Sequence, residues 1–391
     1  MCCTLPTPAA PQALPAGPVA LADGRFVLGA DLAATAAPED PGFFNYSDYE
    51  HSTLRQLRLG LTASFEATSH LTFLGELRSE NFSEVEAFAL FARIRPWRTR
   101  RFDIQVGRIP PTFGSFTRRA YGHQNPLIGY PLAYQYLTSL RPDAVPANAE
   151  ELLRMRGRGW LSSFGIGDQT PARGLPLVTV FSWDTGVQIN TGWRGLDVTA
   201  SITNGSASNP RVGDDNDGKQ VAARLSAQPR AGLAIGASFA RGAFVDRRVL
   251  HAGIIPADSS TVQQALGLDV EVARDRWLAR TDVVLSEWTL PVVGSPAITK
   301  PLQALAMSLE GRYTFLPGVY AAARAEHLTF SRLAPPARPV PWEAAVTRIE
   351  IGGGYYIQRN VVARVSLQMN RRDGGRVRSA NLPAVQLLYW F

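Results

Sequence analysis

The sequence predicts an all-β fold: a transmembrane, antiparallel, up-and-down β-barrel of about sixteen strands, with short periplasmic turns and long outer loops. Three observations predict it. Apolar residues recur at every second position, connections alternate between short and long, and each alternating segment has about ten residues, the length of a tilted strand that crosses a bilayer. Because successive side chains of a strand point to opposite faces, this period gives each strand one apolar and one polar face.

The alternation is clearest in three segments, RLGLTASFEA (58–67), LQALAMSLEGRYTF (302–315) and NVVARVSLQMN (360–370). No segment has a sustained helical period of 3.6 residues. Taken in order along the chain, the pattern predicts strands near 25–34, 54–67, 70–79, 85–95, 101–108, 182–190, 195–203, 219–228, 231–240, 265–274, 276–286, 302–315, 318–328, 345–355, 359–370 and 381–391.

The connections between these strands fall into two classes. Counted from the first strand, the even connections are short: TSH, RPWRTR, TGWR, QPR, RD, LPG and QR. The odd connections are mostly long, and only the one at 81–84 is brief. This sorting is typical of outer-membrane barrels, whereas a Greek-key sandwich gives no reason for it. Long connections are expected at 35–53, 109–181, 204–218, 241–264, 287–301, 329–344 and 371–380.

The composition is that of an ordered chain, with 45% hydrophobic and 19% charged residues among 391. No run approaches the roughly 18 apolar residues of a spanning helix. The net charge of +7 is dispersed along the chain, which argues against a nucleic-acid partner. The two cysteines, Cys2 and Cys3, are adjacent, so neither a disulfide framework nor a thiolate metal site is expected.

The segment 1–24 is rich in proline and alanine and is expected to be a flexible leader, with 25–391 forming a single barrel domain. The leader lacks the basic and apolar regions of a secretory signal. If the protein is exported, its signal therefore lies upstream of this start or has been removed.

The polar faces of the strands decide between a dry core and a wet lumen. Charged residues recur on nearly every polar face, among them Arg58, Arg224 and Glu310. Burying unpaired charges costs several kcal/mol each, so such faces can line a closed barrel only if its interior holds water. A barrel of about sixteen strands leaves an aqueous channel, whereas side chains fill one of about eight. The sequence therefore predicts a pore.

Two aromatic girdles are expected at the two water–lipid boundaries of the wall. Trp288 and Trp342 lie beside long connections and are predicted to belong to the outer girdle. The other girdle is predicted from residues beside the short turns: Trp97, Trp193, Trp277, Phe315 and Tyr355.

The chain ends in VQLLYWF, with Phe391, Tyr389 and Leu387 at alternate positions. This ending resembles the terminal signal by which the barrels of bacterial outer-membrane porins are recognised for insertion. The resemblance implies that the last strand pairs with the first, that these three residues face lipid, and that the barrel-assembly machinery is a partner. Leu388 departs from the pattern, because it is apolar at a position that faces the lumen.

The stretch VGRIPPTFGSF (106–116) resembles the end of the fifth strand and the start of the third long loop in phosphate-selective (O/P-type) and related sixteen-stranded porins. In that family the loop folds into the lumen, so the resemblance implies the same for 109–181. It also implies a place in the bacterial outer membrane, contact with its lipid and lipopolysaccharide, and a homotrimer. It does not extend to phosphate selectivity.

The connection 109–181 is strongly basic, although Asp143, Glu150 and Glu151 offset part of its charge. Arg154, Arg156 and Arg158 would share one face if the segment were extended. Charged rings set the selectivity of pores, so an anion-favouring constriction is one interpretation of these residues. The candidates for it are Arg118, Arg119, Arg141, Arg154, Arg156 and Arg158 from the connection, and Arg58, Arg78, Arg93 and Arg95 from the strands.

The alternative is that these arginines pair with lumen carboxylates such as Glu66, Glu76 and Asp103, and thereby fix the connection to the wall. Both interpretations stay open, and they can coexist as a transverse electric field across the constriction.

Enzyme motifs are missing: the five histidines are scattered, and the sequence has no HExxH pair, GxSxG elbow, Walker loop or dinucleotide fingerprint. The turn GDDNDGK (213–219) fails the EF-hand spacing and is interpreted as an exposed acidic turn, with a weak divalent site that bridges lipopolysaccharide as the alternative. Neither an enzyme nor a metal or other cofactor is expected.

Two functions follow as alternatives. The first is a passive diffusion channel for small hydrophilic solutes, with a preference for anions. The second is a non-conducting structural or adhesion barrel, plugged by its longest loop. Single-channel conductance separates the two.

Overall fold

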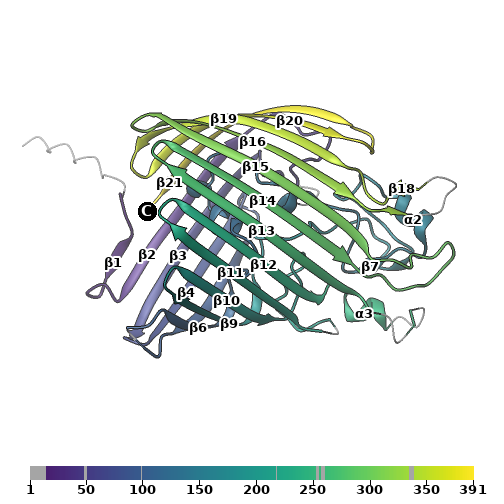
Figure 1. The fold of residues 1–391 in the computed structure, drawn as a ribbon, viewed down its shortest axis with the longest axis horizontal. Coiled ribbons are helices and arrows are strands. Elements are labelled where there is room, and N and C mark those ends of the chain that lie inside the picture. The colour runs from purple at the N-terminus through teal and green to yellow at the C-terminus, as the bar shows by residue number, and fades with distance from the viewer. Residues whose placement is uncertain are drawn as a thin grey trace, which may run out of the picture.

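The computed structural model describes residues 15–47, 51–97, 99–216, 218–251, 255–256, 260–333 and 339–391, and omits the side chain of Arg118. Within these residues one antiparallel sheet of seventeen strands closes on itself (Figure 1). The short β1 (Val19–Leu21) is added at one end of β2, and the other sixteen strands form the wall. The predicted sixteen-stranded antiparallel barrel is confirmed.

Each predicted wall strand is present, with its ends displaced by a few residues. The wall consists of β2 (Phe26–Ala36), β3 (Gln56–Thr68), β4 (Leu71–Glu80), β5 (Val85–Ile94), β6 (Phe102–Ile109), β9 (Asp184–Trp193), β10 (Leu196–Thr203), β11 (Gln220–Arg230), β12 (Leu233–Ala243), β13 (Val262–Arg274), β14 (Trp277–Trp288), β15 (Leu302–Leu316), β16 (Val319–Phe330), β19 (Val346–Gln358), β20 (Val361–Arg372) and β21 (Ser379–Trp390).

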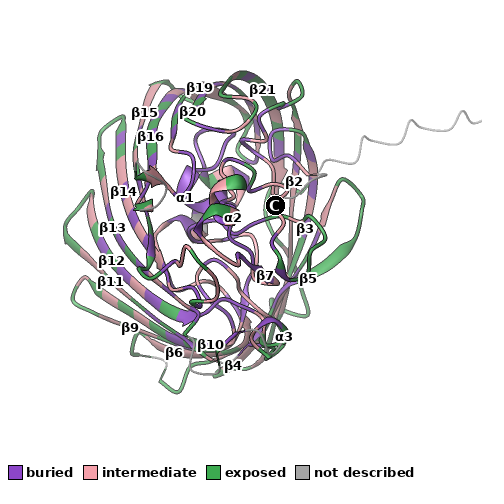
Figure 2. Cartoon of the chain, turned by 90° about the vertical axis from the view of Figure 1, so that its right-hand side faces the viewer, coloured by how far each residue is buried: buried purple, intermediate pink, exposed green. Residues whose placement is uncertain are grey.

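The period of two sorts the side chains as predicted. In β13, Leu266 and Leu268 are exposed on the outside, whereas Asp269 is buried inside, opposite Asp282 of β14. Figure 2 shows the same alternation of exposed and buried residues along many strands of the ring. The outer surface is therefore an apolar belt, and the charged residues of the wall point into the barrel.

The last strand closes the barrel. β21 pairs with β2, so that Tyr389 lies opposite Leu32 and Leu387 opposite Ala34. The Phe391 N–H donates to the Ala30 carbonyl at 3.0 Å, and the Phe391 carbonyl accepts from the Ala30 N–H at 3.1 Å. Closure matters because hydrocarbon offers no hydrogen-bonding partner to an open strand edge.

β1 corrects part of the predicted leader. Residues 1–14 lie outside the described residues, but Val19–Leu21 pair with the first three residues of β2. The pairing of β21 with β2 extends from Ala36 to Asp31, and Phe391 bonds to Ala30, so this pairing does not include the first residues of β2. β1 supplies the hydrogen-bonding partners that the beginning of β2 would otherwise lack.

Of the two predicted aromatic girdles, the one beside the short turns is observed and the one beside the long loops is not. At the rim with short turns, Trp97, Trp193 and Trp277 are exposed on the outside, as expected. Trp288 and Trp342 are fully buried instead and contact each other edge to face at 5.9 Å. They point inward because the interior near the long loops is filled by apolar residues, which gives an indole ring more buried contact than the membrane boundary does.

In their described parts, the long connections contain only short elements. Outside the connection between β6 and β9, these are α3 (Arg247–Leu250) and the two-stranded sheet of β17 (Arg332–Leu333) and β18 (Val340–Pro341). None of the helices in the described ranges is long and apolar enough to cross a membrane. In the turn 213–219, Asp214 pairs with Lys219 and Asp215 with Arg211.

The apolar belt predicts how stability depends on depth in a bilayer. Leu268 lies at the middle of β13 and Leu316 at the short-turn end of β15, and their exposed fractions are 64% and 63%. In lipid vesicles, Leu268→Arg is expected to lower the free energy of unfolding by about 2–4 kcal/mol, and Leu316→Arg by about 0–1 kcal/mol. Urea unfolding of the refolded variants measures both, and equal losses would contradict a lipid-facing belt.

Candidate functional site

The long loop, residues 110–183 between β6 and β9, crosses the interior of the barrel. Figure 2 shows α1 and α2 inside the ring of strands. Asn148 caps the N-terminus of α2, and its side chain accepts the Glu151 N–H at 2.9 Å. The elements of the loop are η1 (Phe116–Ala120), η2 (Gly122–Gln124), α1 (Leu132–Gln135), β7 (Ala144–Val145), α2 (Ala149–Arg154) and β8 (Ile166–Gly167).

A buried network of arginines and carboxylates joins the loop to β14, β15 and β16. Arg119 of the loop donates to Asp282 at 2.8 Å and to Glu310 at 3.4 Å. Glu310 also accepts from Arg324, at 3.2 Å. Arg324 pairs in addition with Glu326 at 3.1 Å. Because each charge faces an opposite charge, the network compensates the cost of taking these groups out of water.

The same wall also holds the backbone of the loop. Glu350 accepts the Gly129 N–H at 2.9 Å, and Arg324 donates to the Gly129 carbonyl at 2.7 Å. Glu326 accepts the Leu132 N–H at 2.8 Å. A Cβ on Gly129 would lie 1.8 Å from the Gln368 amide nitrogen, so glycine is what lets the backbone approach this closely. The segment 129–132 is therefore fixed against β16, β19 and β20.

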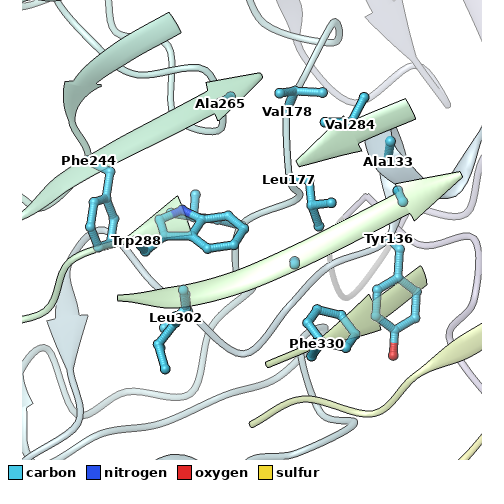
Figure 3. Packing of buried hydrophobic residues seen from close by; sticks show 14 of the residues in the cluster. Ala133, Tyr136, Leu177, Val178, Phe244, Ala265, Val284, Trp288, Leu302 and Phe330 are labelled. Atoms are coloured by element: carbon cyan, nitrogen blue, oxygen red, sulfur yellow. The ribbon is translucent and has the colours of Figure 1, made fainter. Parts of the chain in front are cut away.

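Nearer to the long-loop end of the barrel, the loop and the wall share an apolar core. Figure 3 shows Trp288, Leu302 and Phe330 of the wall in one cluster with Tyr136 and Leu177 of the loop. All five side chains are buried. The half of the barrel formed by β11–β19 is therefore largely filled near its long-loop end, and little of it remains open to water.

On the opposite wall, polar side chains fix the start of the loop. Arg58 of β3 donates to the Tyr130 hydroxyl at 2.9 Å and pairs with Asp31 of β2 at 3.3 Å. Glu76 of β4 accepts the Tyr121 hydroxyl at 2.6 Å and pairs with Arg78 at 2.7 Å. Of the carboxylates predicted to fix the loop, Glu76 does contact it.

The remaining loop arginines lie apart from this region. Arg141 is buried and makes a two-pronged pair with Asp143, both bonds 2.8 Å long. Arg156 pairs with Asp373 of the connection before β21, at 2.7 Å. Arg154 and Arg158 are exposed. The condition for a shared face is not met, because Ala149–Arg154 form α2 and a turn follows, so the segment is not extended.

The other predicted residues occupy separate positions along the wall. Arg93 is half-buried, and its Nε has no hydrogen-bond partner among the described residues. Asp103 accepts from Gln105 at 3.0 Å and from Asn190 at 3.1 Å, and among the described side chains no residue of the loop donates to it. Glu66 and Arg95 are exposed near the short turns, and the side chain of Arg118 lies outside the described part. The role of this set in selectivity remains a prediction.

Glu343 was not identified from the sequence as a residue of the site. Its buried carboxylate accepts N–H groups from Ser139, Gly157 and Ala344, and thus joins two parts of the long loop to the connection before β19. Burial raises the pKa of Glu343, although these backbone donors oppose the shift. Its neighbours in sequence are Trp342 and Ala344, so no periodicity marks it as a contact of the loop.

A cavity of about 690 Å³ remains between the long loop and the wall of β3–β5. Residues of the connections at 37–55, 81–84 and 204–219 line it together with the long loop, so it lies at the long-loop end of the barrel. The fixed loop therefore divides the interior into a packed half and a half with room for solutes.

The buried network predicts that Glu350 holds the loop. Glu350→Ala leaves the Gly129 N–H without its acceptor and Arg324 with one carboxylate fewer, so it is expected to cost about 3 kcal/mol of stability. It is also expected to speed proteolytic cleavage within the loop. The matched control is Glu271→Ala, which removes a half-exposed carboxylate from Arg280 and is expected to cost under about 1 kcal/mol. Equal cleavage rates and unfolding midpoints in the two variants would contradict this role.

No family model and no curated protein matches the chain. Three solved structures illustrate what it is similar to in fold. OmpT, an outer membrane protein of Vibrio cholerae, has 11% identity and a TM-score of 0.56, over 95% of this chain and 100% of that one. The anion-selective porin from Comamonas acidovorans has 9% identity and a TM-score of 0.56, over 94% and 99%. Salmonella typhi OmpF, in complex with daunomycin, has 12% identity and a TM-score of 0.55, over 94% and 97%.

At these identities the similarity concerns the fold, and it extends over nearly the whole length of both chains in each comparison. The closed wall, the apolar belt and the charged interior agree with it. The chain therefore has the fold of the bacterial outer-membrane porins.

Proposed function

We propose that the protein is a passive diffusion channel for small hydrophilic solutes in the bacterial outer membrane. The observation that carries this proposal is the division of the lumen. A closed wall with an apolar outside and a charged inside holds a fixed loop against one half, while the other half keeps a cavity of about 690 Å³. An apolar outer wall is stable in contact with lipid, and a polar cavity of this size can form part of an aqueous path. The proposed activity is transport and involves no catalysis.

One observation favours the second candidate, a non-conducting structural or adhesion barrel. The apolar core between the loop and β11–β19 resembles the interior of a plugged barrel, with Trp288 and Trp342 fully buried. The first candidate is supported better, because the apolar contact between the wall from β3 to β5 and the loop is smaller. It consists of Phe88 and Phe91 against Trp183, and the cavity beside it is lined largely by polar groups.

The preference for anions is a finer proposal, and the ion pairs restrict which residues support it. Arg58, Arg78 and Arg119 each face a carboxylate, so their charges are largely neutralised. Two inward arginines have other partners: Arg312 lies over the Tyr320 ring, and Arg364 donates to the Gly122 carbonyl and to Gln386. Together with Arg93, they are the cations that support an anion preference.

The assembly and its partners are proposed on the same basis. One similar structure is described as a trimer form of OmpT, and we propose a homotrimer with lipid and lipopolysaccharide around it. Phe391, Tyr389 and Leu387 are proposed as the insertion signal for the barrel-assembly machinery. Their support is that β21 is the closing strand and that Leu387 is exposed on the outside.

Conductance in a planar bilayer tests the main proposal. Refolded protein is expected to insert with stepwise increases in current, because each inserted barrel adds one aqueous path. Heat-denatured protein at the same concentration is the control. Insertion without current steps would support the non-conducting barrel instead.

The reversal potential under a KCl gradient tests the anion preference. Chloride is expected to be favoured, and Arg93→Glu is expected to reduce or invert that preference because it replaces an unneutralised cation by an anion. Arg141→Gln is the control, since Arg141 is buried against Asp143. Cation preference of the unmodified protein would contradict this part of the proposal.

A further inference from the structure

The cavity at the long-loop end carries an excess of unneutralised negative charge. Of the three arginines that line it, Arg58 and Arg78 pair with Asp31 and Glu76, which do not line the cavity, and Arg173 donates to the Ser47 carbonyl. Of the four carboxylates that line it, Asp143 pairs with Arg141, and within the described ranges no cation lies within 4.0 Å of the other three. These are Glu80, Glu84 and Glu86, all from the hairpin of β4 and β5.

The hairpin holds these carboxylates in place. Asn81 and Phe82 at its turn have positive φ angles of 53° and 56°, and the Asn81 side chain accepts the Leu57 N–H at 2.9 Å. This is also the shortest connection at the long-loop end of the wall, so the cavity is reached over a low rim here. Glu84 and Glu86 are exposed, and a solute that enters the mouth meets them first.

A buried acceptor of the long loop lies beside the same cavity. Gln135 lines the cavity with 3% of its surface exposed, and its Oε1 has no hydrogen-bond donor among the described residues. The orientation of the amide follows from its neighbour. The Thr53 hydroxyl donates to the Asn45 carbonyl, so it accepts the Gln135 Nε2–H at 2.7 Å. Oε1 is thus left to accept a hydrogen bond from elsewhere.

The rest of the lining is partly apolar. Leu137, Leu175 and Phe181 belong to it, together with the rings of Tyr130 and Tyr134. A site with carboxylates at its rim, an unsatisfied acceptor in its wall and apolar contacts between them matches a solute of corresponding chemistry. Such a solute has a positively charged hydrogen-bond donor and a compact apolar body.

We propose that this cavity binds organic solutes that carry a protonated amino group on an apolar or aromatic body. The ammonium group would lie near Glu84 and Glu86 with a hydrogen bond available to Gln135, and the body would contact Leu137 and Phe181. The proposal deepens the proposed diffusion function, because it names a class of solute that the mouth selects before passage. It concerns binding at the mouth, and the anion preference concerns small ions deeper in the lumen.

Calorimetric titration of the full-length refolded barrel in detergent micelles tests the proposal without requiring conduction. The probes are 2-phenylethylamine, the neutral 2-phenylethanol and the anionic phenylacetate, which share one ring and differ in charge. The amine is expected to bind tightest. The double variant Glu84→Gln/Glu86→Gln is expected to weaken the amine by about tenfold and leave the alcohol unchanged. Raising the salt concentration is expected to weaken the amine alone.

Two further variants make the test specific. Glu39→Gln removes an exposed carboxylate from the connection at 37–55, outside the cavity lining, and is expected to bind the amine as the unmodified protein does. Gln135→Met removes the buried acceptor at similar side-chain volume and is expected to weaken binding of the amine about threefold. The gel mobility of the unheated variant checks that it is folded.

Equal binding of the amine and phenylacetate would overturn the proposal, and so would an unchanged amine affinity in the double variant. Conductance recorded in parallel separates the proposed channel from the proposed amine site. Current steps without amine binding would refute the amine site and leave the channel intact. Amine binding without current steps would refute the channel and leave the site intact.

Discussion

The backbone of the wall must find all its hydrogen-bonding partners within the wall, because hydrocarbon supplies none. Closure of β21 onto β2 meets this requirement, and β1 fills the edge that β21 leaves uncovered. Closure in turn fixes the faces: with a period of two, every strand that turns an apolar side to lipid must turn its other side inward. The concentration of charge inside the barrel is thus a consequence of the wall.

The charges inside explain why the long loop is held so firmly. Asp282, Glu310 and Glu350 project from neighbouring strands, and the loop supplies Arg119 and the Gly129 N–H to meet them. The polar groups of the wall and of the loop are each other's hydrogen-bonding and ion-pair partners, because neither set would be stable when buried against an apolar partner. The connections at the long-loop end differ in length. The one at 81–84 is the shortest, and the cavity lies beside it.

The strands and the parity of the connections were predictable because they depend on local alternation. Arg58, Arg78 and Glu76 were correctly placed on inward faces for the same reason. The contacts of the loop were not predictable, since they join residues that no period relates, such as Arg119 with Glu310 or Ser139 with Glu343. Trp288 and Trp342 were misplaced because a tryptophan beside a long loop meets either lipid or a packed interior, and only the course of the loop decides which.

The arginine content of the chain therefore says little by itself about the charge that a solute meets. The net charge is +7, yet Arg119 and Arg324 form ion pairs with carboxylates of the wall. Arg141 forms one with Asp143 of its own loop. What a solute meets first is set by groups left without partners. At the mouth these are the carboxylates of the β4–β5 hairpin. Deeper in the lumen lie Arg93, Arg312 and Arg364, each without a carboxylate partner among the described residues. On the proposed path, the sign of the local charge would thus change. Residue counts cannot show such a change, because pairing is decided by three-dimensional contacts.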